Sequence, residues 1–94
     1  MFEGNLENVK TYLEKIGARY NVVITNGFEQ VYVFEKDAYD KRKEHPRKYK
    51  DLYVSYLRMS KHDGDDRLYT RRDGIVGYLP DYRIKEIIDE LTGI

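Results

Sequence analysis

The side chains best suited to metal or acid–base chemistry lie in one short stretch, His62-Asp-Gly-Asp-Asp66. Closely spaced carboxylates can hold a divalent cation, but a calcium loop of the EF-hand type starting at Asp63 needs Glu at its twelfth position, where this chain has Gly74. Asp and Gly also form plain turns, because they tolerate left-handed backbone. With no cysteine and only two histidines, we expect no catalytic residue, no metal and no cofactor. A metal-dependent enzyme at 62–66 is the least favoured alternative.

The segment 36–51 concentrates positive charge. Its basic residues are interleaved with Tyr39 and Tyr49, a composition that suits contact with phosphate groups. The segment joins two predicted strands and is longer than a hairpin connection, which is typical of a functional loop. A solvated charged loop is the alternative. The basic candidates for binding are Lys41, Arg42, Lys43, Arg47, Lys48 and Lys50.

Aromatic residues form a third candidate site, since the chain has ten tyrosines and three phenylalanines but no tryptophan. Alternate residues of a strand lie on opposite faces, so the predicted strands divide into an apolar face and an aromatic, guanidinium-bearing face. Tyr and Arg are enriched at protein-binding hot spots, and aromatic faces with basic rims also stack unpaired bases. If the sheet is covered on both sides, this second face is instead part of the core. Its candidates are Tyr32, Phe34, Tyr53, Leu57, Tyr69, Arg67 and Arg71, and the covered face is expected to carry Tyr20, Val22, Ile24, Val31, Val33, Leu52, Val54, Tyr56 and Leu68.

Two amphipathic helices are predicted to flank these strands, at 5–17 and 81–92, because apolar residues recur there at helical spacing. Polar residues that can accept from the first turn precede each helix, and a glycine ends each one. The predicted caps are Asn5 and Gly17 for the first helix, and Asp81 and Gly93 for the second.

Between the helices the pattern predicts antiparallel strands. The runs 20–25 and 28–35 flank Asn26-Gly27, a strong signal for a type I′ hairpin turn, which needs positive φ at both central residues. Three further strands are predicted at 52–59, 67–71 and 75–79. The chain is thus expected to be a single α+β domain over 1–94, with an antiparallel four- to five-stranded meander sheet between an N-terminal and a C-terminal helix.

The stretch Asp73-Gly-Ile-Val-Gly-Tyr-Leu-Pro-Asp-Tyr82 resembles the end of a Src-homology-type small barrel, where a tight hairpin precedes a Gly-aromatic-aliphatic-Pro run. The resemblance covers only this short part of the chain, and the paired tryptophans of that family are absent. It implies a barrel-like curvature of the sheet. We assign no family.

Charge cancels over the whole chain but not along it. Residues 1–35 hold three basic and five acidic side chains, 36–72 hold twelve and seven, and 73–94 hold two and five. Such polarity favours a partner with a patterned surface. We predict a small non-enzymatic protein-binding module, an adaptor or an inhibitor of a larger complex, of the phage or mobile-element type that blocks host defence machinery. The main alternative is a nucleic-acid-binding protein that uses the basic 41–50 loop and the Tyr/Arg face, and a homodimer is left open.

Location is inferred from what the chain lacks. No apolar run approaches the ~20 residues that span a bilayer, and the start, MFEGNLENVK, lacks the pattern of a signal peptide. The lack of cysteine fits a reducing compartment. We therefore expect a soluble, cytoplasmic protein without membrane contact.

Overall fold

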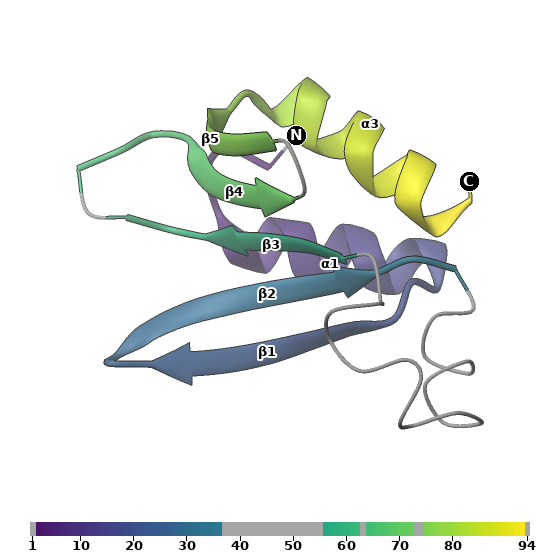
Figure 1. Cartoon of the computed structure of the whole chain (residues 1–94), viewed down its shortest axis with the longest axis horizontal. Helices are drawn as coiled ribbons and strands as arrows, with labels where there is room; N and C mark the ends of the chain where they lie inside the picture. Colours follow the sequence, from purple (N-terminus) through teal and green to yellow (C-terminus); the bar gives the residue numbers. More distant parts are fainter. Residues whose placement is uncertain (1, 37–55, 63, 73–74, 94) are drawn as a thin grey trace.

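The computed structural model describes residues 2–36, 56–62, 64–72 and 75–93 and arranges them as an α+β fold (Figure 1). In chain order its elements are α1 (Leu6–Ile16), β1 (Tyr20–Thr25), β2 (Phe28–Phe34), β3 (Tyr56–Ser60), β4 (Leu68–Arg72), β5 (Ile75–Leu79) and α3 (Asp81–Thr92). Each strand pairs antiparallel with the next, in the order β1-β2-β3-β4-β5. The predicted helix–meander–helix architecture is confirmed.

The sheet is open, with β1 and β5 as its two edges. It does not close into the barrel that the 73–82 stretch suggested. Within the described ranges, neither helix is long and apolar enough to cross a bilayer.

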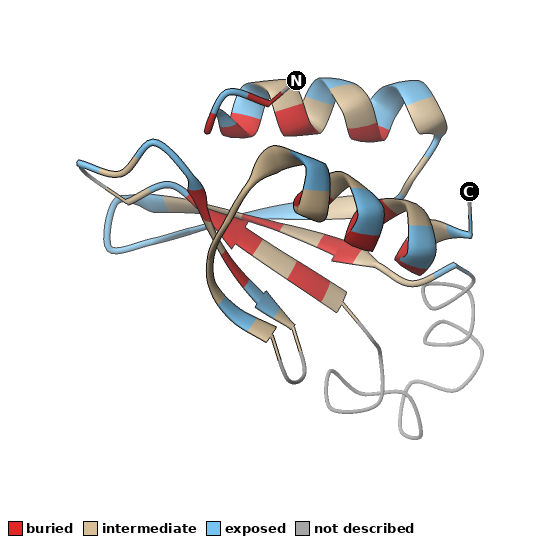
Figure 2. Ribbon diagram, turned by 90° about the horizontal axis from the view of Figure 1, so that it is seen from above, coloured by how far each residue is buried: buried red, intermediate tan, exposed pale blue. Residues whose placement is uncertain are grey.

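Both helices cover the same face of the sheet, as Figure 2 shows from above. α1 contributes Leu6, Val9 and Leu13 to the core, and α3 contributes an isoleucine-rich stripe. The strand residues that meet them are fully buried and lie on one face because of the strand alternation. The core consists of Phe2, Leu6, Val9, Leu13, Val31, Val33, Leu57, Met59, Leu68, Ile84, Ile87, Ile88 and Leu91.

Three of the four predicted helix caps are confirmed. The Asn5 side chain accepts a hydrogen bond from the Glu7 N–H at 2.8 Å, and Gly17 and Gly93 adopt left-handed geometry. The prediction for Asp81 is wrong, because Pro80 precedes α3 and Asp81 is its first helical residue.

Asp81 instead holds the N-terminal segment. Its carboxylate accepts hydrogen bonds from the backbone N–H groups of Phe2, at 3.0 Å, and Glu3, at 2.8 Å. Phe2 is buried and packs edge-on against Tyr12, with ring centroids 5.7 Å apart. The N-terminal segment is therefore fixed to the first turn of α3, over the core.

The hairpin between β1 and β2 matches its prediction. Asn26 and Gly27 have φ values of 52° and 80°, as a type I′ turn requires. Thr25 pairs with Phe28 across the turn, and the register continues to Tyr20 opposite Val33.

The side chains of β3 lie on the opposite faces of the sheet from those predicted. Leu57 pairs with Val33 and is buried under the helices, whereas Tyr56 pairs with Phe34 on the other face. The run 52–59 has large apolar or aromatic residues in both alternating sets, so its pattern did not decide between the faces. The pairing with β2 does.

The edge strand β1 is less covered than predicted. Val22 and Ile24 lie on the helix side, since Val22 pairs with buried Val31, but their side chains are 43% and 70% exposed. The helices pack over the inner strands and leave this edge free.

Candidate functional site

The face of the sheet opposite the helices, named the open face below, has no helix over it in the described part of the chain. The cross-strand pairs place two rows of side chains side by side on it. One row runs Asn21, Tyr32, Arg58, Arg71, Val76, and the other runs Val23, Gln30, Ser60, Tyr69, Tyr78. Thr25, Phe28, Phe34 and Tyr56 complete the face, and none of these side chains is a carboxylate.

Four of the seven predicted sheet-face residues lie on the open face: Tyr32, Phe34, Tyr69 and Arg71. Arg67 lies just before β4, with its guanidinium 6.0 Å from the Tyr78 ring centroid. Leu57 is a core residue, which corrects its assignment to this face. Tyr53 and the six basic candidates (Lys41, Arg42, Lys43, Arg47, Lys48 and Lys50) lie outside the described residues.

The tyrosines of the open face are half-buried. Tyr32 and Tyr56 contact each other at a centroid distance of 5.5 Å, and the Tyr32 hydroxyl donates to Gln30 Oε1 at 3.2 Å. Each ring thus packs against a neighbour while part of its surface stays accessible to solvent.

His62 organises a second aromatic group at the end of β3. Its ring stacks on Tyr69, with centroids 4.8 Å apart and planes 19° apart, and meets Tyr78 edge-on at 5.7 Å. Both ring nitrogens have hydrogen-bond partners, with Ser60 Oγ 3.1 Å from Nε2 and the Tyr78 hydroxyl 3.1 Å from Nδ1. The three rings are therefore held in one geometry, which lowers the entropy cost of binding against them.

Two arginines of the open face oppose each other directly. Arg58 and Arg71 are cross-strand partners, and like charges in this position repel. Neither forms an ion pair with a residue that the structure describes. Their forked donors suit a carboxylate or phosphate of a partner, which would also relieve the repulsion.

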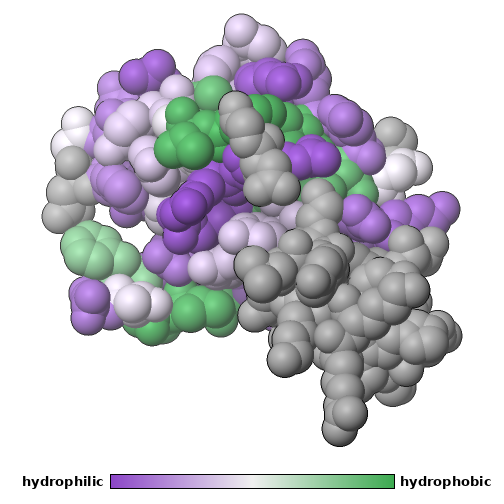
Figure 3. Space-filling model, in the orientation of Figure 1, coloured by the Kyte–Doolittle hydropathy of each residue, from purple (hydrophilic) through white to green (hydrophobic). Residues whose placement is uncertain are grey.

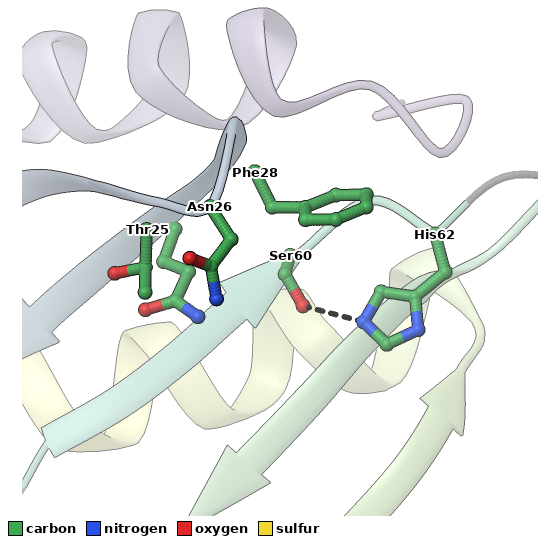
Figure 4. Close-up of a pocket in the computed structure, with 6 residues that line it drawn as sticks. Thr25, Asn26, Phe28, Ser60 and His62 are labelled. Atoms are coloured by element: carbon green, nitrogen blue, oxygen red, sulfur yellow. Dashed lines mark hydrogen bonds between the residues drawn. The ribbon is translucent and has the colours of Figure 1, made fainter.

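A shallow hollow of about 390 Å³ lies beside the histidine group, lined by residues of the β1–β2 hairpin and of β3. Figure 4 shows the Phe28 ring projecting across it toward His62, and a hydrogen bond joins the Ser60 hydroxyl to the His62 imidazole. Phe28 is 51% exposed and forms an apolar wall of the hollow. Its lining residues are Thr25, Asn26, Phe28, Gln30, Ser60 and His62.

Sequence reasoning missed several open-face residues. Tyr56 was assigned to the wrong face, and Arg58 and Tyr78 were not assigned to either. His62 was judged only as a metal ligand or catalytic residue. The strand alternation around Tyr69 and the predicted 75–79 hairpin strand contained the signal for Tyr78, since Tyr69 pairs with it.

Ionisable groups with shifted pKa values belong to the helix side. Burial and a 2.5 Å hydrogen bond to Asp89 raise the pKa of Tyr12. Burial acts to raise the pKa of Asp89, but Lys85 and Tyr12 together outweigh it and lower that pKa. Hydrogen bonds to Glu29 and Glu7 raise the pKa of Lys10. These contacts tie α1 to α3 and to β2.

Asp63 of the predicted 62–66 turn lies outside the described residues, and among the residues that are described no group of three or more His, Asp or Glu side chains converges. Comparisons of the chain with protein-family models, curated proteins and solved structures give no match. The open face is therefore the candidate functional site.

Proposed function

We propose that this protein is a non-enzymatic protein-binding module that docks through the open face onto a partner with an apolar centre and acidic residues. The observation that carries the proposal is the direct pairing of Arg58 and Arg71 beside half-buried tyrosines, on a described face without a carboxylate.

The composition of the face supports a protein partner. Interfaces between proteins combine aromatic and Arg anchors with aliphatic contacts and exclude most other charges. The open face has this mixture, with Val76 63% exposed and Val23 41% exposed at its two edges. An adaptor or an inhibitor of a larger complex, including one of the phage or mobile-element type, would use such a surface.

Nucleic acid is the second candidate, favoured by the same arginine pair and by rings on which unpaired bases can stack. Exposed aliphatic side chains and a formal net charge of zero weigh against it. Sheet faces that bind single strands usually have a strong excess of positive charge.

Affinity capture with the full chain as bait tests the proposal. Tyr69→Ala and Arg71→Ala should each weaken the capture of one stoichiometric protein from the source cells by roughly 30-fold or more, the effect of a hot-spot residue. Arg83→Ala is the matched control, because Arg83 lies on α3 and pairs with Glu86. Circular dichroism verifies that each variant is folded.

Nuclease treatment and oligonucleotide titration separate the two candidates. A protein partner is expected to remain captured after nuclease treatment, and a single-stranded oligonucleotide should bind weakly at physiological salt. Tight oligonucleotide binding that weakens steeply with salt and is lost in Arg71→Ala would replace the proposal with the nucleic-acid function.

A further inference from the structure

The edge strand β1 has no neighbouring strand on the side opposite β2, within the described part of the chain. All its residues after Tyr20 are exposed, including Val22, Val23 and Ile24. In Figure 3 the lower edge of the molecule, where β1 lies, has hydrophobic surface. The strand contains no charge, no proline and no bulge, which are the features that usually protect a sheet edge from pairing.

The free hydrogen-bonding groups of this edge can be assigned from the register. The Phe34 N–H donates to the Arg19 carbonyl at 3.4 Å, and Thr25 and Phe28 close a two-residue turn. Since bonding alternates along an antiparallel ladder, the odd-numbered residues of β1 bond to β2. The N–H and C=O groups of Val22 and Ile24 therefore point away from the sheet.

The chemistry of β1 is symmetric about Val23. It reads Asn21, Val22, Val23, Ile24, Thr25, so two apolar neighbours and then two polar residues flank the central valine. An antiparallel pair of two copies centred on Val23 places Val22 opposite Ile24 of the second copy, and Asn21 opposite its Thr25. Apolar residues meet apolar ones, polar residues meet polar ones, and no like charges meet.

We infer that a second copy of this chain occupies the β1 edge, forming a two-fold dimer whose axis passes beside Val23. The outward-pointing backbone N–H and C=O groups of Val22 and Ile24 form the hydrogen bonds between the two copies. The helices of both copies then lie on the same face of the joined sheet. The open faces then join into one continuous surface. The inference does not depend on the nature of the partner proposed above.

The other edge offers a poorer match. β5 contains Gly77, with a φ of 142°, and four of its five residues are half-buried. Val76 is its exposed apolar residue, which makes position 76 a suitable control.

Disulfide trapping tests the dimer and its register together, because the natural chain has no cysteine. Val23→Cys should form a covalent dimer under mild oxidation, since the two copies of residue 23 would face each other about 4.5 Å apart between Cα atoms, within disulfide range. Asn21→Cys, on the same strand and face, should not, since its two copies would be about 13 Å apart along the strands. Val76→Cys should not either.

Sedimentation equilibrium of the unmodified chain, from micromolar to near-millimolar concentration, should show reversible dimers. Val23→Lys should be monomeric because it places two ammonium groups face to face, whereas Val76→Lys should still dimerise. A monomer at every concentration, a dimer that survives Val23→Lys, or equal cross-linking at positions 21, 23 and 76 would overturn the inference. A β1 edge used by a different protein would give the first of these results.

Discussion

Asp89 shows how one carboxylate joins the two helices. On α3 it accepts a 2.5 Å hydrogen bond from Tyr12 of α1 and a 2.5 Å contact from Lys85. Burial alone would raise its pKa, but these partners lower it below the usual value of 3.8. The folded state therefore keeps Asp89 ionised at a lower pH than the unfolded chain does. Its stabilising effect is present above 3.8 and is lost as the pH falls through the lower, folded-state pKa.

Replacing this carboxylate should have a pH-dependent effect. Asp89→Asn is expected to unfold at lower urea concentration than the natural chain at neutral pH, and the difference should shrink as the pH falls below 3.8. Urea denaturation at several pH values measures it. Glu90→Gln, which removes an exposed carboxylate from the same helix, is the control. A pH-independent difference for Asp89→Asn would contradict the assigned ion pair.

At the scale of elements, the N-terminal segment docks on the turn before β4. Gly4, with a φ of 62°, lies so close to the backbone carbonyl of Asp66 that a Cβ atom would be 2.0 Å from that oxygen. Backbone is in contact there, so no side-chain rotation can make room. The turn is thus fixed by the segment that also holds Phe2 in the core.

Gly4→Ala should lower the free energy of unfolding by about 3 kcal/mol or more, because left-handed geometry costs roughly 1–2 kcal/mol and the clash with Asp66 adds to it. Gly64→Ala is the matched control, since its φ is 79° but no atom lies within 4 Å of the added Cβ. It should show only the conformational cost. Chemical denaturation measures both variants, and equal losses would mean that the N-terminal segment does not dock as described.

The elements that the sequence predicted correctly are those set by neighbouring residues. Asn5, Asn26-Gly27 and Gly17 act within their own turn, so their roles follow from the local sequence. Asp81 was misassigned because its hydrogen-bond donors lie 78 and 79 positions away. Contacts between segments this distant in the chain have no local pattern.

The candidate site was predictable only in outline for the same reason. The idea of a Tyr/Arg face followed from strand alternation around Tyr32 and Tyr69, and the structure places both there. The opposition of Arg58 and Arg71 depends on the β3–β4 register, which neither strand specifies alone. The role of the basic residues of 41–50 in binding remains a prediction, because these residues lie outside the described part of the chain.

At the scale of the whole molecule, the two sides of the sheet differ in their charged groups. The helix layer contains ion pairs, such as Lys10 with Glu7 and Arg83 with Glu86. The strand residues of the open face have arginines without carboxylates. Arg58 and Arg71, two basic residues of the positive middle segment, thus lie on the side of the sheet away from the helices.

The cross-strand pairing of Arg58 with Arg71 implies a conflict between the stability of the isolated protein and the binding of a partner. Arg58→Met and Arg71→Met should each stabilise the isolated protein by about 0.2–1 kcal/mol, because the repulsion between like charges disappears while the aliphatic stem is kept. Arg83→Met, which breaks an attractive pair, should not raise the melting temperature. Thermal unfolding measures all three. If the stabilised variants also lose their partner, this surface keeps a local frustration that only complex formation resolves. Selection for a more stable isolated protein would then remove its ability to associate.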